Sequence, residues 1–179
     1  FPKEILRPAN HRAQNDGLFL YITPIPASAF LMPIHILSIG DRMPGWVEAG
    51  YAEYAKRLPH EARLLLHEVP AGKRGKNADI ARLLREEGER LLAAVPRGAH
   101  VIALERTGRV IDTAGLATRL QDWQQQGVTP AILIGGPEGL DPACLAAARE
   151  QWSLSALTLP HPLVRVLLAE QLYRAWSIM

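Results

Sequence analysis

The segment of the sequence that is most informative about the architecture reads Ile132-Leu133-Ile134-Gly135-Gly136-Pro137-Glu138-Gly139-Leu140. A short apolar run enters a glycine-rich turn here, as it does where a buried strand of a parallel sheet leads into a helix. Ligands of such sheets bind beyond the carboxyl ends of the strands, where glycines let backbone amides approach them closely. The segment therefore indicates a small-molecule site at Gly135, although by itself it fits a tight turn without a ligand equally well. It matches neither G-x-G-x-x-G nor G-x-x-x-x-G-K-[ST].

On both sides of this segment, from Met32 onward, short apolar runs alternate with longer stretches of helical period. This alternation predicts an α/β fold, in which helices flank a parallel-type sheet. Strands are expected at residues 34–39, 64–69, 101–104, 131–134 and 155–159, and helices at residues 47–58, 78–94, 114–126, 142–151 and 162–178. Asn77 or Asp79 can cap the second helix. The last helix is apolar enough to be buried in the core or across a dimer interface.

A second informative segment, residues 152–165, contains a proline-bounded loop and the start of the last helix. Pro162 suits the first turn of that helix, whose free amides face the same sheet edge as the glycine-rich turn. His161 and Arg165 lie close to this edge. A histidine in such a loop is more often bonded to the backbone than catalytic, and Arg165 can equally be a surface charge.

A third segment, residues 71–77, places Lys73, Arg74 and Lys76 on a glycine-bearing loop after the second expected strand. Positive side chains on such a loop can neutralise the phosphates of a nucleic acid and release its counterions. A short basic run is also commonly a solvated surface, so the pattern alone does not decide between the two readings.

The composition restricts the class of protein and the kinds of site that these segments can form. The 179 residues fit one domain, and 48% hydrophobic with 21% charged residues is typical of a globular protein. The net charge of +2 is too small to indicate a nucleic-acid partner by itself. Cys144 is the only cysteine, which excludes an internal disulfide, argues against a thiolate metal site and favours a reducing cytoplasm. We expect no metal.

The first 31 residues differ from the rest of the chain. They begin with Phe1, contain several prolines and show little periodic pattern. Their apolar part, residues 18–31, is interrupted by Pro24 and Pro26 and is too short to span a bilayer. Its length alone is compatible with a secretory signal, but the rest of the chain shows no extracellular character, so we expect no membrane association. We therefore predict an N-terminal extension at residues 1–31 and the functional domain at residues 32–179.

Four segments carry a likeness to a known family. They are GDRMPGWVEAGYAEY at residues 40–54, PAGKRGKNADI at 70–80, LIGGPEGL at 133–140 and WSLSALTLPHPLVRVLLAEQLYRAWSI at 152–178. Together and in this order they resemble the ribosomal RNA large subunit methyltransferase H family of the SPOUT superfamily. The likeness runs from about Met32 to Met179, and segments of this length are far more specific than a short motif.

The resemblance implies an α/β domain with a C-terminal trefoil knot, which acts as a homodimer. It implies methylation of N3 of a pseudouridine in 23S ribosomal RNA within the assembled ribosome, with S-adenosyl-L-methionine as the cofactor. The expected cofactor-binding residues lie at three strand ends and are Leu104, Gly135, Leu154, Ser155, Ala156, Leu157, Thr158 and Leu159. Family members continue beyond the equivalent of Ile178 with a short polar tail that contributes to the active site, whereas this sequence stops at Met179.

The implied chemistry needs few catalytic side chains, because the sulfonium of the cofactor already activates the methyl group. The acceptor nitrogen becomes nucleophilic when it loses its proton, so a nearby base or a cation helps. Glu138 and His161 are candidates for taking the proton, and Arg165 for stabilising charge or holding phosphate. Lys73, Arg74 and Lys76 are expected to bind RNA.

Two other functions are compatible with parts of the pattern. A non-catalytic ribosome- or RNA-binding protein of the same fold would account for the basic loop, and S-adenosylmethionine binding discriminates against it. A doubly wound nucleotide-binding enzyme is disfavoured, because Gly40 stands nearly alone after the first expected strand, where the glycine fingerprint would lie.

Overall fold

The computed structural model describes residues 31–179, so the predicted N-terminal extension lies outside the described residues except for Leu31. The strands are β1 (Ile34–Ile39), β2 (Leu64–Val69), β3 (His100–Val110), β4 (Pro130–Ile134) and β5 (Glu150–Ser153). The helices are α1 (Gly45–Ala55), α2 (Ile80–Ala93), α3 (Thr113–Gln126), α4 (Pro142–Ala147) and α5 (His161–Ser177), with a short 3₁₀ helix η2 (His60–Ala62).

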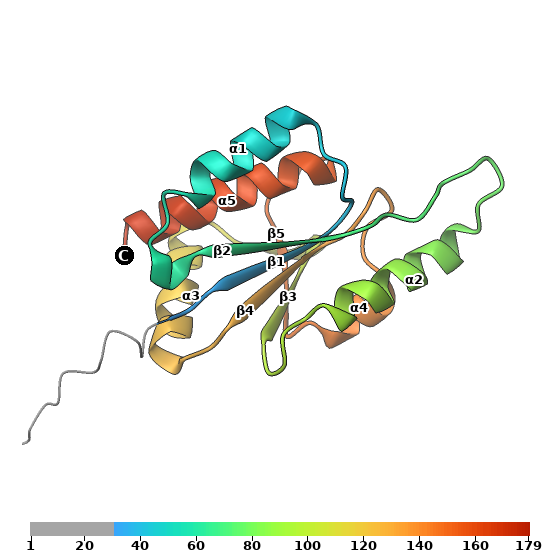
Figure 1. Ribbon diagram of the computed structural model, residues 1–179. Helices are drawn as coiled ribbons and strands as arrows, with labels where there is room; N and C mark the ends of the chain where they lie inside the picture. The colour runs from blue at the N-terminus through green and yellow to red at the C-terminus, as the bar shows by residue number, and fades with distance from the viewer. Residues whose placement is uncertain (1–30) are drawn as a thin grey trace, which may run out of the picture.

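The five strands form one parallel sheet in the order β2-β1-β4-β3-β5. Helices α1, α3 and α5 cover one face, and α2 and α4 cover the other, as Figure 1 shows. The sheet is thus buried on both sides, which is why the central strand β4 is apolar and buried at all five positions. This architecture confirms the predicted α/β class with flanking helices.

Alternate side chains of each strand build two separate cores. Ile36 and Ile132 point toward α3 and α5, whereas their neighbours Leu37 and Leu133 point toward α2 and α4. Leu168 of α5 is fully buried, which confirms that this helix contributes to the core. Because the strands are parallel, their carboxyl ends meet at one edge of the sheet, where the predicted site residues lie.

The predictions for residues 142–159 were wrong in two places. The helix expected at 142–151 ends at Ala147, because Ala148 is extended and the chain continues as β5. The strand expected at 155–159 is a loop, and the paired strand is Glu150–Ser153, which lies beside β3 and buries Trp152 at 1% exposure. The apolar run that suggested a strand leaves Leu157 73% exposed. Tertiary pairing, rather than local apolarity, selected the strand.

Other boundaries differ less. Asp79 is the cap of α2, since its carboxylate accepts the Arg82 amide at 3.0 Å, and the helix starts at Ile80. Strand β3 runs past Leu104 to Val110, with an irregularity in its pairing to β5 between Leu104 and Arg109.

The trefoil knot stays a prediction. Among residues 31–179, no helix has both the length and the apolarity to cross a bilayer.

Candidate cofactor site

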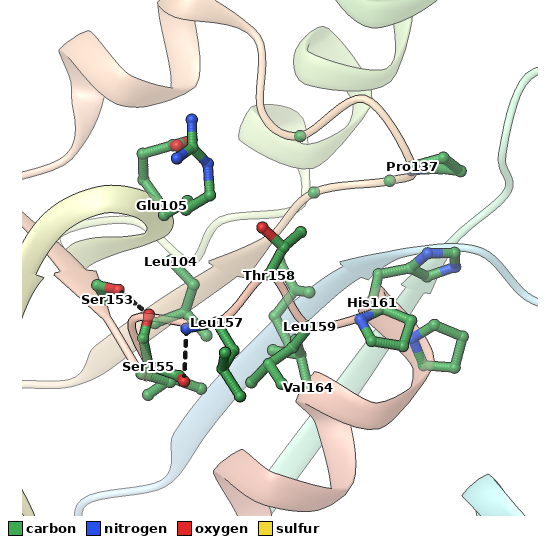
Figure 2. A pocket seen from close by; sticks show the side chains of 18 of the residues that line it. Leu104, Glu105, Pro137, Ser153, Ser155, Leu157, Thr158, Leu159, His161 and Val164 are labelled. Atoms are coloured by element: carbon green, nitrogen blue, oxygen red, sulfur yellow. Dashed lines mark hydrogen bonds between the residues drawn. The ribbon is translucent and has the colours of Figure 1, made fainter.

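A cavity of about 940 Å³ opens at the carboxyl ends of β3, β4 and β5. It lies between Leu104 to Arg106 of β3, the turn after β4, and the loop of residues 154–160 that leads into α5. Figure 2 shows Leu104, Leu157, Leu159 and Val164 gathered in it, with Glu105 and His161 on opposite sides of the view. A concave, largely apolar volume of this size suits a small organic ligand.

The turn after β4 is closed upon itself. The amide of Gly139 donates to the carbonyl oxygen of Gly136 at 3.0 Å, and Gly139 has a φ of +88°, which favours glycine. A Cβ at Gly135 would stand 2.3 Å from the carbonyl carbon and oxygen of Gly139, so two backbone segments touch at this position. The glycines are therefore required by the shape of the turn itself.

The loop of residues 154–160 forms the opposite wall. The Ser153 hydroxyl donates to the Ser155 carbonyl oxygen at 2.9 Å, and the Ser155 hydroxyl oxygen accepts the Leu157 amide at 2.9 Å, as drawn in Figure 2. These two bonds fix the conformation of the loop, although it forms neither helix nor strand. Within residues 31–179, the amides of Thr158 and Leu159 have no hydrogen-bond partner, so they are available to polar groups of a ligand.

His161 and Glu138 both line the cavity, and each has a shifted pKa. Burial, aided by the nearby Arg165 and Arg74 guanidinium groups, lowers the pKa of His161 below its usual 6.5. His161 is therefore neutral at pH 7. Hydrogen bonds from Arg74 lower the pKa of Glu138, which keeps this carboxylate ionised and makes it a weaker base.

Arg165 does not line the cavity, and the reading of it as a surface charge was wrong, since it is 1% exposed. Its Nε donates to Ser38 Oγ at 3.0 Å and its Nη1 to a Glu68 carboxylate oxygen at 2.6 Å. Its Nη2 donates to the carbonyl oxygens of Ile39 at 3.0 Å and Gly40 at 2.5 Å. Arg165 thus ties α5 to the ends of β1 and β2, and these bonds leave the guanidinium little capacity for a ligand.

The basic loop between β2 and α2 lies beside the turn after β4, but its three cations do not line the cavity. Lys73 and Lys76 are exposed. Arg74 instead turns inward and forms ion pairs with Glu87 at 2.9 Å and Glu138 at 2.6 Å. The three cations that the sequence groups together therefore have two different environments.

Most of the expected cofactor residues meet at this cavity. Leu104, Gly135, Leu154, Ser155, Leu157, Thr158 and Leu159 line it, whereas Ala156 does not. Sequence reasoning missed Glu105 and Arg106, which line the cavity directly after Leu104. The signal was available, because polar residues that follow a buried strand lie at the carboxyl edge of the sheet.

A family model described as "Predicted SPOUT methyltransferase" matches residues 32–179. The chain belongs to the SPOUT methyltransferase family. A curated relative of this SPOUT methyltransferase, the "Ribosomal RNA large subunit methyltransferase H" of Thioalkalivibrio sulfidiphilus (strain HL-EbGR7), is 58% identical over 148 residues, which are 83% of this chain and 95% of the relative. The recognised resemblance is thereby confirmed.

Two solved structures have a fold similar to that of this SPOUT methyltransferase. One is described as "Probable Methyltransferase from Bordetella pertussis Tohama I", with a TM-score of 0.52 and 17% identity over 83% of this chain and 96% of that one. The other is a "probable methylase family protein from Haemophilus influenzae Rd KW20", with a TM-score of 0.50 and 15% identity over 83% of this chain and 68% of that one. At these identities they support the fold alone.

SPOUT methyltransferases use S-adenosylmethionine, and the cavity fits it. Apolar side chains such as Leu104 and Leu159 suit an adenine ring, and the free amides of Thr158 and Leu159 suit its polar edge. Within residues 31–179, no group of three or more His, Cys, Asp or Glu side chains could hold a metal ion.

Proposed function

We propose that this methyltransferase modifies N3 of a pseudouridine in 23S ribosomal RNA, within the assembled ribosome and thus in the cytoplasm. The observation that carries the proposal is the 58% identity, over 95% of its length, to a relative named for the large-subunit ribosomal RNA. The cavity at the strand ends supports it, because it can hold the methyl donor. Transfer of labelled methyl groups to ribosomes tests it.

The proposed cofactor-binding site consists of Leu104, Gly135 and the loop of residues 154–159. When bound there, S-adenosylmethionine supplies a methyl group already activated by a sulfonium. The chain's own contribution is to hold the donor in a fixed apolar volume and to present the acceptor nitrogen in line with it. Gly135 supports this role because its missing side chain lets the turn close at the pocket wall.

His161 is the proposed proton acceptor. Transfer of the cofactor's methyl group to N3 would require the N3 proton to leave. A neutral imidazole can take this proton, and burial keeps His161 neutral. Glu138 is less suited, because its carboxylate is bonded to Arg74 at 2.6 Å. The internal bonds of Arg165 point to a role in holding α5, rather than to direct charge stabilisation.

We propose a homodimer as the acting form. Apolar side chains that remain exposed on helix α1 and directly after helix α5 supply surface for it, namely Trp46 at 59% and Ile178 at 58% exposure. Large exposed apolar side chains are frequent at interfaces between subunits.

Lys73 and Lys76 are the proposed phosphate-binding side chains of the basic loop. Replacing both by alanine is expected to weaken ribosome binding and to flatten the plot of log affinity against log salt concentration by about 0.7–0.9 for each phosphate that is no longer neutralised. Cofactor affinity should not change, because neither side chain lines the cavity. Ribosome-binding titrations at several salt concentrations measure the slope, and an unchanged slope would remove both lysines from the RNA-binding surface.

A further inference from the structure

Arg74 is the member of the basic loop whose position the sequence does not explain. Its Nε and Nη2 donate to Glu138 Oε2 at 2.8 and 2.6 Å. Its Nη1 donates to the Gly72 carbonyl oxygen at 3.0 Å and to Glu87 Oε1 at 2.9 Å, and its Nη2 donates to Glu87 Oε2 at 3.0 Å. A guanidinium has five N–H donors, and here five bonds engage all of them. No donor is left for a phosphate.

Glu87 shows that this arrangement is built into the fold. It lies on α2 and is 1% exposed, and its Oε1 also accepts the amide of Gly72 at 2.7 Å. A buried carboxylate is costly unless it is paired and hydrogen-bonded. Arg74 therefore stabilises the buried negative charge of Glu87 on α2. In return, Glu87 fixes the position of the guanidinium group.

The other side of Arg74 contacts the turn that walls the cofactor cavity. Glu138 belongs to this turn, and a Cβ at Gly136 would stand 3.2 Å from Nη2 of Arg74. Arg74 thus lies against the turn at two points, while its ion pair with Glu87 connects it to α2. The guanidinium joins three segments that are distant in sequence: the basic loop, α2 and the turn.

We propose that Arg74 is a positioning residue for the methyl transfer, which holds the Gly135–Gly139 turn in the shape that accepts the cofactor, and that it does not contact RNA. The inference rests on the proposed function, because it assumes that the cavity is the cofactor site. It divides the basic loop into two parts: Lys73 and Lys76 face the RNA, and Arg74 organises the pocket.

The test compares Arg74→Ala and Arg74→Lys with the Lys73→Ala/Lys76→Ala variant as the matched control. Calorimetric titration with S-adenosylmethionine should show an affinity loss of about ten- to a hundredfold for both Arg74 variants, because the ammonium of lysine cannot bridge two carboxylates and a carbonyl. The control should bind the cofactor as the parent does. The salt slope of ribosome binding should change in the control and stay unchanged in Arg74→Ala, which removes the charge that a phosphate contact would need.

The pH dependence of methyl transfer gives a second readout that a purely structural role would not move. The Arg74 cation contributes to the low pKa of His161, whereas Glu138 and Glu87 raise this pKa. Removing the cation should move the acid limb of the rate profile to higher pH in Arg74→Ala. The limb should stay in place in the control.

Glu138→Gln covers the case in which Arg74→Ala does not fold. It weakens the link to the turn and keeps the buried pair of Arg74 with Glu87, so the fold should survive. We expect a cofactor affinity loss of at least about threefold. Unchanged cofactor affinity in a folded Arg74 variant and in Glu138→Gln would overturn the proposal, as would a flattened salt slope in Arg74→Ala. Absence of cofactor binding in the parent would instead refute the proposed function.

Discussion

Gly135→Val is expected to reduce the affinity for S-adenosylmethionine by at least about a hundredfold. The reason is the backbone: a Cβ at this position would stand 2.3 Å from the carbonyl group of Gly139 and 2.8 Å from the Leu140 amide nitrogen. These backbone atoms can move only if the turn opens, and the turn is a wall of the cavity. Calorimetric titration with the cofactor measures the loss.

Gly135→Ala separates two explanations of this effect. If the side chain acts by filling the pocket, alanine should be tolerated better than valine. If it acts by the backbone overlap, alanine should already cause most of the loss. Gly45→Ala is the matched control, because a Cβ at Gly45 has no atom within 4 Å. Parent-like affinity in both Gly135 variants, with a parent-like thermal transition, would place the cofactor elsewhere.

His161→Gln is expected to lower kcat for methyl transfer by about a hundred- to ten-thousandfold, the usual contribution of a positioned base. The pH dependence of the rate shows whether His161 takes the proton. Burial lowers the pKa of His161 below 6.5, so the neutral, proton-accepting form prevails at pH 7, and the rate of the parent should fall only as the pH drops through this lowered value. The variant should lack that acid limb.

A histidine outside the site provides the control for this prediction. His60 is exposed on η2, and it does not line the cavity, so His60→Gln should retain both the rate and the acid limb of the parent. Rates and pH profiles of the two variants are to be compared at saturating cofactor. If His161→Gln keeps the parental kcat and acid limb, another group takes the proton.

Hydropathy patterns were sufficient to predict the layered α/β architecture, but they did not locate the edge strand β5. Strand β4 is a continuous apolar run that is buried at all five positions, and β1 is buried at five of its six positions. Strand β2 is only partly buried, and its apolar start, residues 64–66, identified it. The segment of residues 150–159 was assigned wrongly, because the apolar residues that line a cavity look like those of a strand. The pairing of Glu150–Ser153 with β3 distinguishes the two.

Charged residues were the other source of error, because sequence alone does not reveal their partners. Arg165 and Arg74 look equally solvated in the sequence, yet each is held by acceptors from distant segments. The acceptors of Arg165 include Ser38 on β1, which lies 127 positions earlier in the chain. Such contacts appear only after the fold has brought the segments together. The glycine-rich turn, in contrast, lies at the carboxyl edge of the sheet as expected, because strand-end topology alone places it there.

Methyl transfer to N3 of a pseudouridine in 23S ribosomal RNA is the reaction proposed for this SPOUT methyltransferase. The decisive experiment incubates the protein and labelled S-adenosylmethionine with ribosomes that lack the modification, and then identifies the labelled nucleoside by mass spectrometry. We expect label in the 23S RNA as N3-methylpseudouridine, and its loss with Gly135→Val. Label in another RNA or at another atom, or no transfer by a protein that binds the cofactor, would contradict the proposed reaction.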